Sequence, residues 1–269
     1  MAKDGGTISG RALVTGASSG IGEELARVLA RHGHDVVLVA RTQAKLEALG
    51  VELSGRYGVK TDALRVDLAD PAGPRSLLEA LRERGLHIDV LVNNAGIGVH
   101  GPFAENDPDA QLRLLQLNVV ALTELTRLLL PAMLAKRFGR ILNVASTAAF
   151  APGPFMAVYY ASKAYVLSLS VALQNELGGT GVSVTTLCPG PTRTHFAEAA
   201  GMKRTRLFRA GGVMDAADVA RAGYDGMQAG KSIVVPGIRN RLIAGSSGLA
   251  PRTMTARIAR ALQDPAHQA

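Results

Sequence analysis

The stretch VYYASK, residues 158–163, holds two tyrosines and a lysine within six positions. Residues four apart share a face of a helix, so Lys163 lies over Tyr159, whereas Tyr160 shares its face with Ala164. A phenol titrates at about 10 in water, and a neighbouring cation favours its phenolate form. Such a tyrosine can exchange a proton with a carbonyl or alcohol oxygen near neutral pH. The spacing predicts proton transfer at Tyr159, although an incidental pair on a helix face would look the same.

A serine precedes this pair at a place where a ligand would be found. The segment RILNVAS reads as a buried strand and ends on Ser146, thirteen residues before Tyr159. The carboxyl ends of parallel strands face the ligand crevice of an open α/β sheet. We therefore expect the Ser146 hydroxyl to lie near the Tyr159 phenol.

Near the N-terminus, the turn TGASSGIG carries three glycines between an apolar strand and an amphipathic helix. Gly16 permits a tight turn, Gly20 lets the backbone approach a pyrophosphate, and Gly22 allows the helix to pack on the strand. The helix N-terminus then offers unpaired N–H groups and a favourable dipole to an anion. Placed after a first strand, this turn predicts a dinucleotide site.

The end of the second strand indicates which dinucleotide binds. The strand ends in VLVARTQ and lacks the acidic residue that usually binds the ribose hydroxyls of NAD. Arg41 stands there instead, and a guanidinium can bind a 2′-phosphate through charge-assisted hydrogen bonds. We therefore predict NADP(H); the alternative is that Arg41 only begins a surface helix. Asp67, after the strand ALRVDL, could accept hydrogen bonds from an adenine edge, cap the next helix, or do both.

The elements that must position these residues alternate as strands and helices. The first 30 or so residues after Gly10 read as strand, glycine turn, helix from about Ser19 to Arg31 and second strand, which is a βαβ unit. Similar units follow, with a long helical region at 111–136, a helix from about Tyr159 to Leu177 and a last strand in SIVVPG. The pattern predicts the α/β class, with a doubly wound, mostly parallel sheet.

One domain is expected over residues 1–269, because 47% hydrophobic content at this length can bury a sizeable core. We expect a core at about 9–236, a substrate loop at about 195–212 and a basic extension at about 237–269. The single cysteine, Cys188, excludes an intrachain disulfide, and the six histidines show no ligand spacing, so no metal site is predicted. The first residues lack the apolar stretch of a secretory signal, so we expect a cytoplasmic protein.

The net charge of +8 lies in the C-terminal third, where residues 202–263 hold eleven Lys or Arg and three acids. Such asymmetry raises nucleic acid, an anionic membrane surface or an acidic substrate as partners. Aromatic residues for base stacking are scarce, so we expect no nucleic acid and favour a solvated surface. A helix with Met254, Ile258 and Leu262 on one side could contact a partner subunit or a membrane, or pack on its own domain.

Taken together, these motifs resemble the short-chain dehydrogenase/reductase family along nearly the whole chain. The matching segments are TGASSGIG, NNAG at 93–96, LNV with Asn118, Ser146, the Tyr159–Lys163 pair and CPGPTRT at 188–194. The resemblance implies a Rossmann fold and an oxidoreductase that uses NADP(H) to reduce a ketone or aldehyde reversibly to an alcohol. It also implies a homodimer or homotetramer, paired through the long helices.

The resemblance also implies roles for single residues. Tyr159 would be the general acid that protonates the carbonyl oxygen as hydride arrives from the nicotinamide, and Ser146 would bind and orient that oxygen. Lys163 would lower the pKa of Tyr159 and bind the nicotinamide ribose, while Asn118 would hold a water that links Lys163 to solvent. Lowering that pKa to about 7 requires roughly 4 kcal/mol, so the charge of a bound nicotinamide is expected to help the lysine. Further residues expected at the cofactor are Ser18, Ser19, Ile21, Leu68, Asn94, Ala95, Gly96, Pro189, Gly190, Thr192 and Thr194.

The sequence determines the substrate less well than the reaction, because this family accepts fatty acyl chains, steroids, sugars and small ketones. The candidate pocket residues are mostly apolar and indicate a hydrophobic carbonyl compound: Ile97, Val99, Phe150, Pro154, Phe155, His195 and Phe196. Two other functions stay open, namely a catalytically idle NADP-binding sensor or scaffold, and a protein of nucleic-acid or membrane surfaces. The intact Ser146, Tyr159 and Lys163 set argues against the sensor, because binding alone needs no poised phenol.

Overall fold

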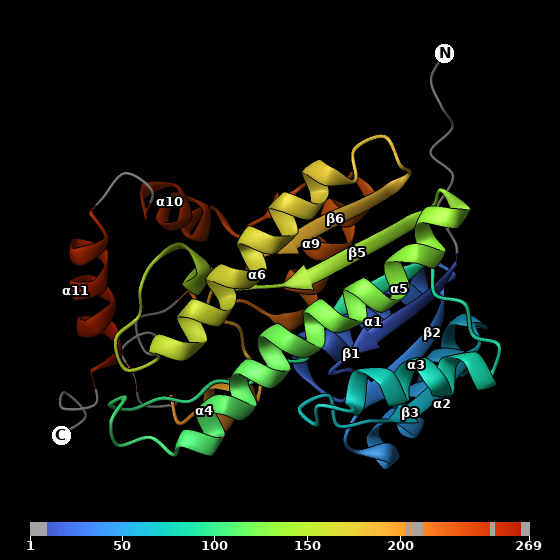
Figure 1. The fold of residues 1–269 in the computed structure, drawn as a ribbon, viewed down its shortest axis with the longest axis horizontal. Coiled ribbons are helices and arrows are strands. Elements are labelled where there is room, and N and C mark those ends of the chain that lie inside the picture. The colour runs from blue at the N-terminus through green and yellow to red at the C-terminus, as the bar shows by residue number, and fades with distance from the viewer. Residues whose placement is uncertain (1–9, 203–204, 206–211, 248–250, 265–269) are drawn as a thin grey trace.

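A seven-stranded sheet organises the chain, in the order β3-β2-β1-β4-β5-β6-β7 (Figure 1). The structure is a computed structural model that describes residues 10–202, 205, 212–247 and 251–264. Every neighbouring pair of strands is parallel. The chain therefore winds in both directions from β1, and a crevice is expected where β1 meets β4. The strands are β1 (Arg11–Thr15), β2 (Asp35–Ala40), β3 (Thr61–Arg65), β4 (Val90–Asn93), β5 (Gly139–Val144), β6 (Val182–Leu187) and β7 (Ile233–Val234).

Helices connect these strands and cover both faces of the sheet (Figure 1). Within the described residues they are α1 (Gly20–Arg31), α2 (Gln43–Tyr57), α3 (Gly73–Glu83), α4 (Pro108–Leu115), the π-helix η1 (Gln116–Ala121), α5 (Leu122–Lys136), the 3₁₀ helix η2 (Thr147–Phe150), α6 (Ala157–Glu176), α7 (Phe196–Ala199), α9 (Ala216–Gln228), α10 (Ile238–Ser247) and α11 (Arg252–Gln263).

Strand β1 shows how the two faces are filled. Ala12 and Val14 pack with α1, α2 and α9 on one face, while Leu13 between them packs with α3 and α5 on the other. All three side chains are fully buried. Because successive side chains of a strand point to opposite faces, a strand covered on both sides must be apolar throughout. The expected doubly wound α/β fold is confirmed.

Several expected boundaries shift by a few residues for local reasons. Helix α1 begins at Gly20, because Ser19 has an extended backbone and serves as the N-cap. The long helical region begins earlier, at Pro108, where Asp107 accepts a hydrogen bond from the Asp109 amide at 3.1 Å. The expected loop at 195–212 contains the short helix α7, and its residues 203–204 and 206–211 lie outside the described part of the chain.

The helical run from α4 to α5 is long and apolar. Residues 108–135 are long and apolar enough to cross a membrane by length and composition alone. Of an apolar 18-residue stretch within them, 39% is buried inside the structure. In the structure this run packs on the sheet, with Leu125, Leu129 and Met133 in the core beside β4 and β5. We interpret it as a core helix with one outer face.

Candidate active site

A cavity of about 1060 Å³ opens at the carboxyl ends of the strands and collects most of the expected site residues. It is lined by eighteen of them: Gly16, Ser18, Ser19, Gly20, Ile21, Arg41, Asp67, Leu68, Asn94, Ala95, Gly96, Ser146, Tyr159, Lys163, Pro189, Gly190, Thr192 and Thr194. Two expected residues, Gly22 and Asn118, stand behind the wall and support it. The chain thus gathers its motifs, which are up to 178 positions apart (Gly16 to Thr194), around one space.

The glycine turn leaves room for a ligand because side chains are excluded from it. Gly16 and Gly20 have φ angles of 66° and 60°, a region that favours glycine. A Cβ on Gly22 would lie 2.3 Å from the Gly16 carbonyl oxygen, so this residue packs α1 onto the turn as expected. The N-terminus of α1 then faces the cavity with backbone N–H groups that can bind a phosphate. The turn fits a dinucleotide pyrophosphate.

Asn94 and Thr15 hold the turn against the end of β4. The Asn94 side chain donates to the carbonyl oxygens of Thr15 and Gly16 at 2.9 and 3.3 Å. The Thr15 hydroxyl accepts from the amides of Asn94 and Ala95, both at 3.0 Å, and donates to Val92 at 3.2 Å. Thr15 was not among the residues expected at the site; its place as the last residue of the first strand was the available signal.

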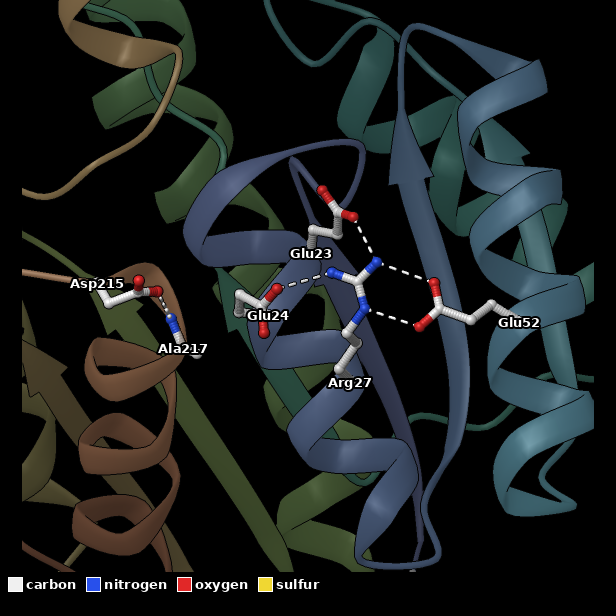
Figure 2. Close-up of polar contacts among 6 residues, drawn as sticks. All are labelled: Glu23, Glu24, Arg27, Glu52, Asp215 and Ala217. Atoms are coloured by element: carbon white, nitrogen blue, oxygen red, sulfur yellow. Dashed lines mark hydrogen bonds and ion pairs between the residues drawn. The ribbon is translucent and has the colours of Figure 1, made fainter.

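Arg27 fixes the helix that begins at this turn (Figure 2). Its guanidinium donates to Glu23 at 2.6 Å and Glu24 at 2.7 Å on α1, and to both carboxylate oxygens of Glu52 on α2 at 2.8 and 2.9 Å. The bond to Glu52 is the main cause that raises the pKa of Arg27, and the same bond lowers the pKa of Glu52. The cluster ties α1, which carries the phosphate-binding turn, to α2.

The other end of α2 brings cations to the cavity. Arg41 precedes the helix and Lys45 lies one turn further, and both side chains are exposed and line the cavity. Lys45 was missed from the sequence, because Arg41 lies before the helix and no helical spacing relates the two residues. The two cations fit the phosphate of an NADP-type ribose.

Asp67 does not cap a helix, contrary to one of its two expected roles. Helix α3 begins six residues later, and its N-cap is Ala72. The Asp67 carboxylate instead accepts from the Ala69 amide at 3.0 Å and from Arg113 of α4 at 2.5 Å. Burial raises the pKa of Asp67. These hydrogen bonds and the nearby charge of Arg41 lower it by a larger amount, so the pKa lies below its usual value. Asp67 is thus a charged acceptor at the cavity edge.

The two hydroxyls and the ammonium expected to act together do meet. The Ser146 hydroxyl lies close enough to the Tyr159 phenol to lower the pKa of the phenol as a hydrogen-bond partner. The Lys163 Nζ lies 5.8 Å from the centroid of the Tyr159 ring and donates to the Val144 carbonyl oxygen at 2.8 Å. Ser146 also accepts from the Ala148 amide at 3.1 Å, which fixes the hydroxyl at the end of β5. The arrangement can bind a carbonyl oxygen between two hydroxyl groups.

The pKa values of this group follow from burial. Tyr159 is 9% exposed, and burial raises the pKa of its phenol, against a smaller lowering effect of the bond to Ser146. Burial lowers the pKa of Lys163 to about 8. From the sequence we expected Lys163 to lower the pKa of Tyr159. With the protein groups alone, burial dominates and this pKa is raised instead. A buried neutral phenol is suited to donate a proton.

Asn118 sits in the π-helix η1, behind Lys163. Its side chain donates to the Ile97 carbonyl at 3.0 Å and to the Ser162 hydroxyl at 3.1 Å, and accepts from the Ile97 amide at 3.0 Å. A Cβ on Gly96 would lie 3.2 Å from Asn118 Oδ1 and 3.4 Å from Lys163 Nζ. The wider turn of a π-helix is frequent at functional sites. Here it places the Asn118 side chain against the backbone of Ile97, close to Lys163.

The substrate side of the cavity differs from expectation. Ile97, His195 and Phe196 line it, but Val99, Phe150, Pro154 and Phe155 do not. Phe150 packs with the cluster around Val166 and Cys188, and Phe155 turns toward Arg260, whose guanidinium carbon lies 5.5 Å from its ring centroid. The wall is completed by residues that sequence reasoning did not assign: Met156, Ala199, Met202, Ile243, Met254, Ile258 and Leu262.

Helix α11 reaches this wall from the end of the chain. The His100 Nε2–H donates to the Gln263 carbonyl oxygen at 2.8 Å, and the Gln263 side-chain amide bonds the Tyr160 hydroxyl. Burial raises the pKa of Tyr160 to about 12, so this second phenol is neutral. The hydrogen bond between Gln263 and Tyr160 ties α11 to the start of α6.

Comparisons with known proteins agree with this site. A family model described as "short chain dehydrogenase" matches residues 11–205. The chain is 39% identical over 178 residues to a very-long-chain 3-oxoacyl-CoA reductase from Phaeosphaeria nodorum, covering 64% of this chain and 52% of that protein. It is 35% identical over 196 residues to the oxidoreductase UcpA from Escherichia coli (strain K12), covering 72% and 74%. The chain thus spans about half the length of the 3-oxoacyl-CoA reductases that it matches.

Solved structures give the same result. A short-chain dehydrogenase from Sphingobium yanoikuyae in complex with NADPH is 35% identical, with a TM-score of 0.79 and coverage of 90% of this chain and 95% of that one. A bulky-bulky ketone specific alcohol dehydrogenase from Comamonas testosteroni is 32% identical, with a TM-score of 0.75 and coverage of 90% and 94%. With the matched segment spanning the glycine turn, Ser146, Tyr159 and Lys163, the chain belongs to the short-chain dehydrogenase family.

Proposed function

We propose that the chain is an NADPH-dependent reductase that converts a hydrophobic ketone or aldehyde reversibly to an alcohol. The observation that carries this proposal is that Ser146 and Tyr159 line the same cavity close together, with the ammonium of Lys163 beside the phenol ring. Two hydroxyls that point at one spot can bind a carbonyl oxygen as negative charge develops on it.

The bound nicotinamide supplies the hydride that the carbonyl carbon accepts. Ser146 donates a hydrogen bond to the carbonyl oxygen and orients the substrate. Tyr159 donates its proton to the same oxygen, so that the carbon gains a hydride, the oxygen gains a proton and the phenol becomes a phenolate. Lys163 lies beside that phenolate and stabilises its charge, and its ammonium can also bind the nicotinamide ribose. Asn118 would hold the water through which the proton is restored.

The preference for NADPH rests on Arg41 and Lys45 at the edge of the cavity. Substitution Arg41→Ala is expected to weaken NADPH binding by roughly tenfold or more and to change NADH binding much less, since only NADPH carries the extra phosphate. Fluorescence titration with both nucleotides measures this, with the exposed Arg31→Ala on α1 as control. Equal losses for the two nucleotides would show that Arg41 does not meet the phosphate.

The proposed substrate class is supported by the wall around Tyr159, where Ile97, Met156, Phe196, Met202 and Leu262 are apolar. Two similar proteins are named for a very-long-chain 3-oxoacyl-CoA and for bulky ketones. Both names fit a large apolar cavity, and a hydrophobic carbonyl compound is the substrate that we propose.

A homodimer or homotetramer is also proposed. The outer face of the run from α4 to α6 exposes apolar side chains that a partner subunit would bury: Leu112, Leu115, Val120, Tyr165 and Val171. Exposed apolar patches of this kind mark association surfaces.

The reaction is tested by NADPH consumption over ketones and aldehydes of increasing chain length. We expect turnover that increases with chain length, and a loss of roughly a hundredfold or more in kcat/KM for Tyr159→Phe. The matched control is Tyr165→Phe, which removes a phenol from the exposed side of the same helix, where it meets Thr123 at 3.0 Å. Undiminished turnover in Tyr159→Phe would remove the phenol from the reaction. Tight NADPH binding without turnover of any compound would assign the chain to a sensor.

A further inference from the structure

A basic and apolar surface surrounds the mouth of the cavity. It is formed by α10 and α11, which lie beyond the carboxyl ends of the strands at one end of the molecule (Figure 1). Helix α10 exposes Ile238, Leu242 and Ile243, and α11 exposes Met254 and Ile258. Large apolar side chains that gather on an exposed surface mark a site of interaction. We call these five residues the mouth surface.

The mouth surface is continuous with the interior of the cavity. Ile243, Met254 and Ile258 line the cavity and are also about half exposed, at 49%, 54% and 53%. Each of these side chains therefore faces both the substrate space and the outside. An apolar molecule on the surface would therefore meet apolar side chains that continue into the cavity.

The charges around the mouth surface are all of one sign along the two helices. Between Asp225 and Asp264 the sequence contains six cations and no acidic residue. Five of the cations are exposed arginines on α10 and α11: Arg239, Arg241, Arg252, Arg257 and Arg260. Arg260 meets Asp264 at 3.9 Å. Apolar side chains flanked by arginines are typical of helices that lie in the interface of an anionic membrane.

We propose that the mouth surface docks on an anionic lipid surface, and that the cavity takes a long-chain carbonyl lipid directly from it. A second copy of the chain is disfavoured as the occupant, because a face-to-face contact would bring like-charged arginines together. An anionic bilayer complements both features, since its headgroups meet the arginines and its acyl region meets the apolar side chains. The choice of substrate rests on the reductase function proposed above, whereas the docking does not.

Binding to vesicles of phosphatidylcholine alone, and with about 30% phosphatidylglycerol, tests the docking by co-sedimentation of the full chain. We expect binding only to the anionic vesicles, and weaker binding at about 0.5 M salt because the charges are then screened. The double variant Arg241→Gln/Arg257→Gln should bind roughly tenfold or more weakly. Its control is Arg31→Gln/Arg82→Gln, which removes exposed arginines from α1 and α3.

An apolar variant makes the test independent of charge. Ile238→Ser/Leu242→Ser removes two residues of the mouth surface that do not line the cavity, and should also release the chain from the vesicles. Val51→Ser is the control, because Val51 on α2 and Ile238 are both 75% exposed. Equal binding to neutral and anionic vesicles, or equal losses in the controls, would overturn the docking. Preferential binding to poly-glutamate would assign the surface to an acidic protein and would overturn it as well.

Kinetics separate this proposal from the reductase function. The arginine double variant should reduce a soluble short-chain ketone at the native rate and a vesicle-borne long-chain ketone several-fold more slowly. If vesicle binding fails while Tyr159-dependent turnover of the soluble ketone persists, the docking is wrong and the reductase function stands. If the chain binds vesicles but reduces neither ketone, the reductase function is wrong.

Discussion

At the scale of single residues, the proposed reaction places two hydroxyls against one carbonyl oxygen and a cation behind them. Burial makes Tyr159 a neutral donor and brings the pKa of Lys163 to about 8. The lysine is therefore close to losing its charge within an accessible pH range. A positive charge at Lys163 is needed to stabilise the phenolate formed after proton donation.

This predicts that kcat/KM for ketone reduction falls as pH rises above about 8. Below that pH Lys163 is protonated, and above it the ammonium that stabilises the phenolate is lost. The variant Lys163→Arg, which stays charged in this range, should shift the decline to higher pH even if its activity is lower at every pH. Initial rates measured from neutral to alkaline pH for both proteins provide the test. A decline at the same pH in the two proteins would assign it to another group.

The residues of the catalytic group could be predicted from the sequence because they are local. Tyr159 and Lys163 are one helical turn apart, so their spacing sets their relation, and Ser146 follows the preceding strand β5 by two residues, which places it at the same edge of the sheet. The effect of burial on Tyr159 could not be predicted, because it depends on Phe196, whose ring centroid lies 5.3 Å from that of Tyr159. The partner Lys45 was missed for another reason: α2 begins only at Gln43, so Arg41 lies outside the helix and no helical spacing points from it to Lys45.

At the scale of elements, helix α1 depends on the cluster around Arg27. One guanidinium holds three carboxylates, and two of them are its neighbours on α1 while Glu52 lies on α2. The cluster therefore fixes the phosphate-binding turn relative to the helix that carries Lys45. Its loss would leave three like charges close together.

We expect Arg27→Met to lower the free energy of unfolding by about 1–3 kcal/mol and to weaken NADPH binding. Methionine keeps most of the apolar stem but leaves Glu23, Glu24 and Glu52 to repel each other. Adding Glu52→Gln should restore part of the loss, because one charge is then removed. Urea unfolding and NADPH titration measure the two effects, with Arg31→Met as control. A change no larger than that of the control would show that the cluster does not hold α1.

The order of strands and helices could be predicted where it depends on the apolar pattern of short stretches of the chain. Apolar runs located the strands, and the turn before Gly20 located α1. The substrate wall was not predictable, because α11 is placed by contacts such as Gln263 with Tyr160, 103 residues away. The side chains after β5 were misassigned for a related reason, since Phe155 takes a φ of 64° and turns away from the cavity.

At the scale of the whole molecule, one buried histidine joins the sheet to α9. The His34 Nδ1–H donates to the Gly10 carbonyl at 3.1 Å, and the Tyr224 hydroxyl of α9 lies 3.5 Å from His34 Nε2. His34 is fully buried, and this burial lowers its pKa below the usual value, against a smaller raising effect of the bond to Gly10. The folded chain thus holds His34 neutral.

The free energy of unfolding should therefore fall as pH decreases from about 7.5 to about 5.5. In this range the unfolded chain binds a proton at His34, with a pKa of about 6.5, while the folded chain binds it only at lower pH. Neutral His34 therefore contributes stability above its pKa in the unfolded chain. This contribution is lost as pH falls toward its pKa in the folded chain, by up to about 1.4 kcal/mol per pH unit. Denaturant unfolding across this range is the measurement.

The variant His34→Asn tests the assignment, because its side-chain amide can keep the bond to Gly10 without titrating. Its pH dependence in this range should be flatter than that of the native chain, whatever its absolute stability. The exposed His87→Asn serves as the control and should keep the native slope. An unchanged slope in His34→Asn would mean that other groups cause the pH dependence.

In the proposed reaction, hydride and proton reach one carbonyl group in the space between Ser146 and Tyr159. The test is a single turnover with NADPH that carries deuterium at both C4 positions of the nicotinamide, followed by mass and NMR analysis of the product. We expect an alcohol with deuterium on the former carbonyl carbon, formed by the native chain and by Tyr165→Phe. Tyr159→Phe should bind NADPH but form this alcohol at least about a hundredfold more slowly. An alcohol without deuterium, or one formed at the native rate by Tyr159→Phe, would contradict it.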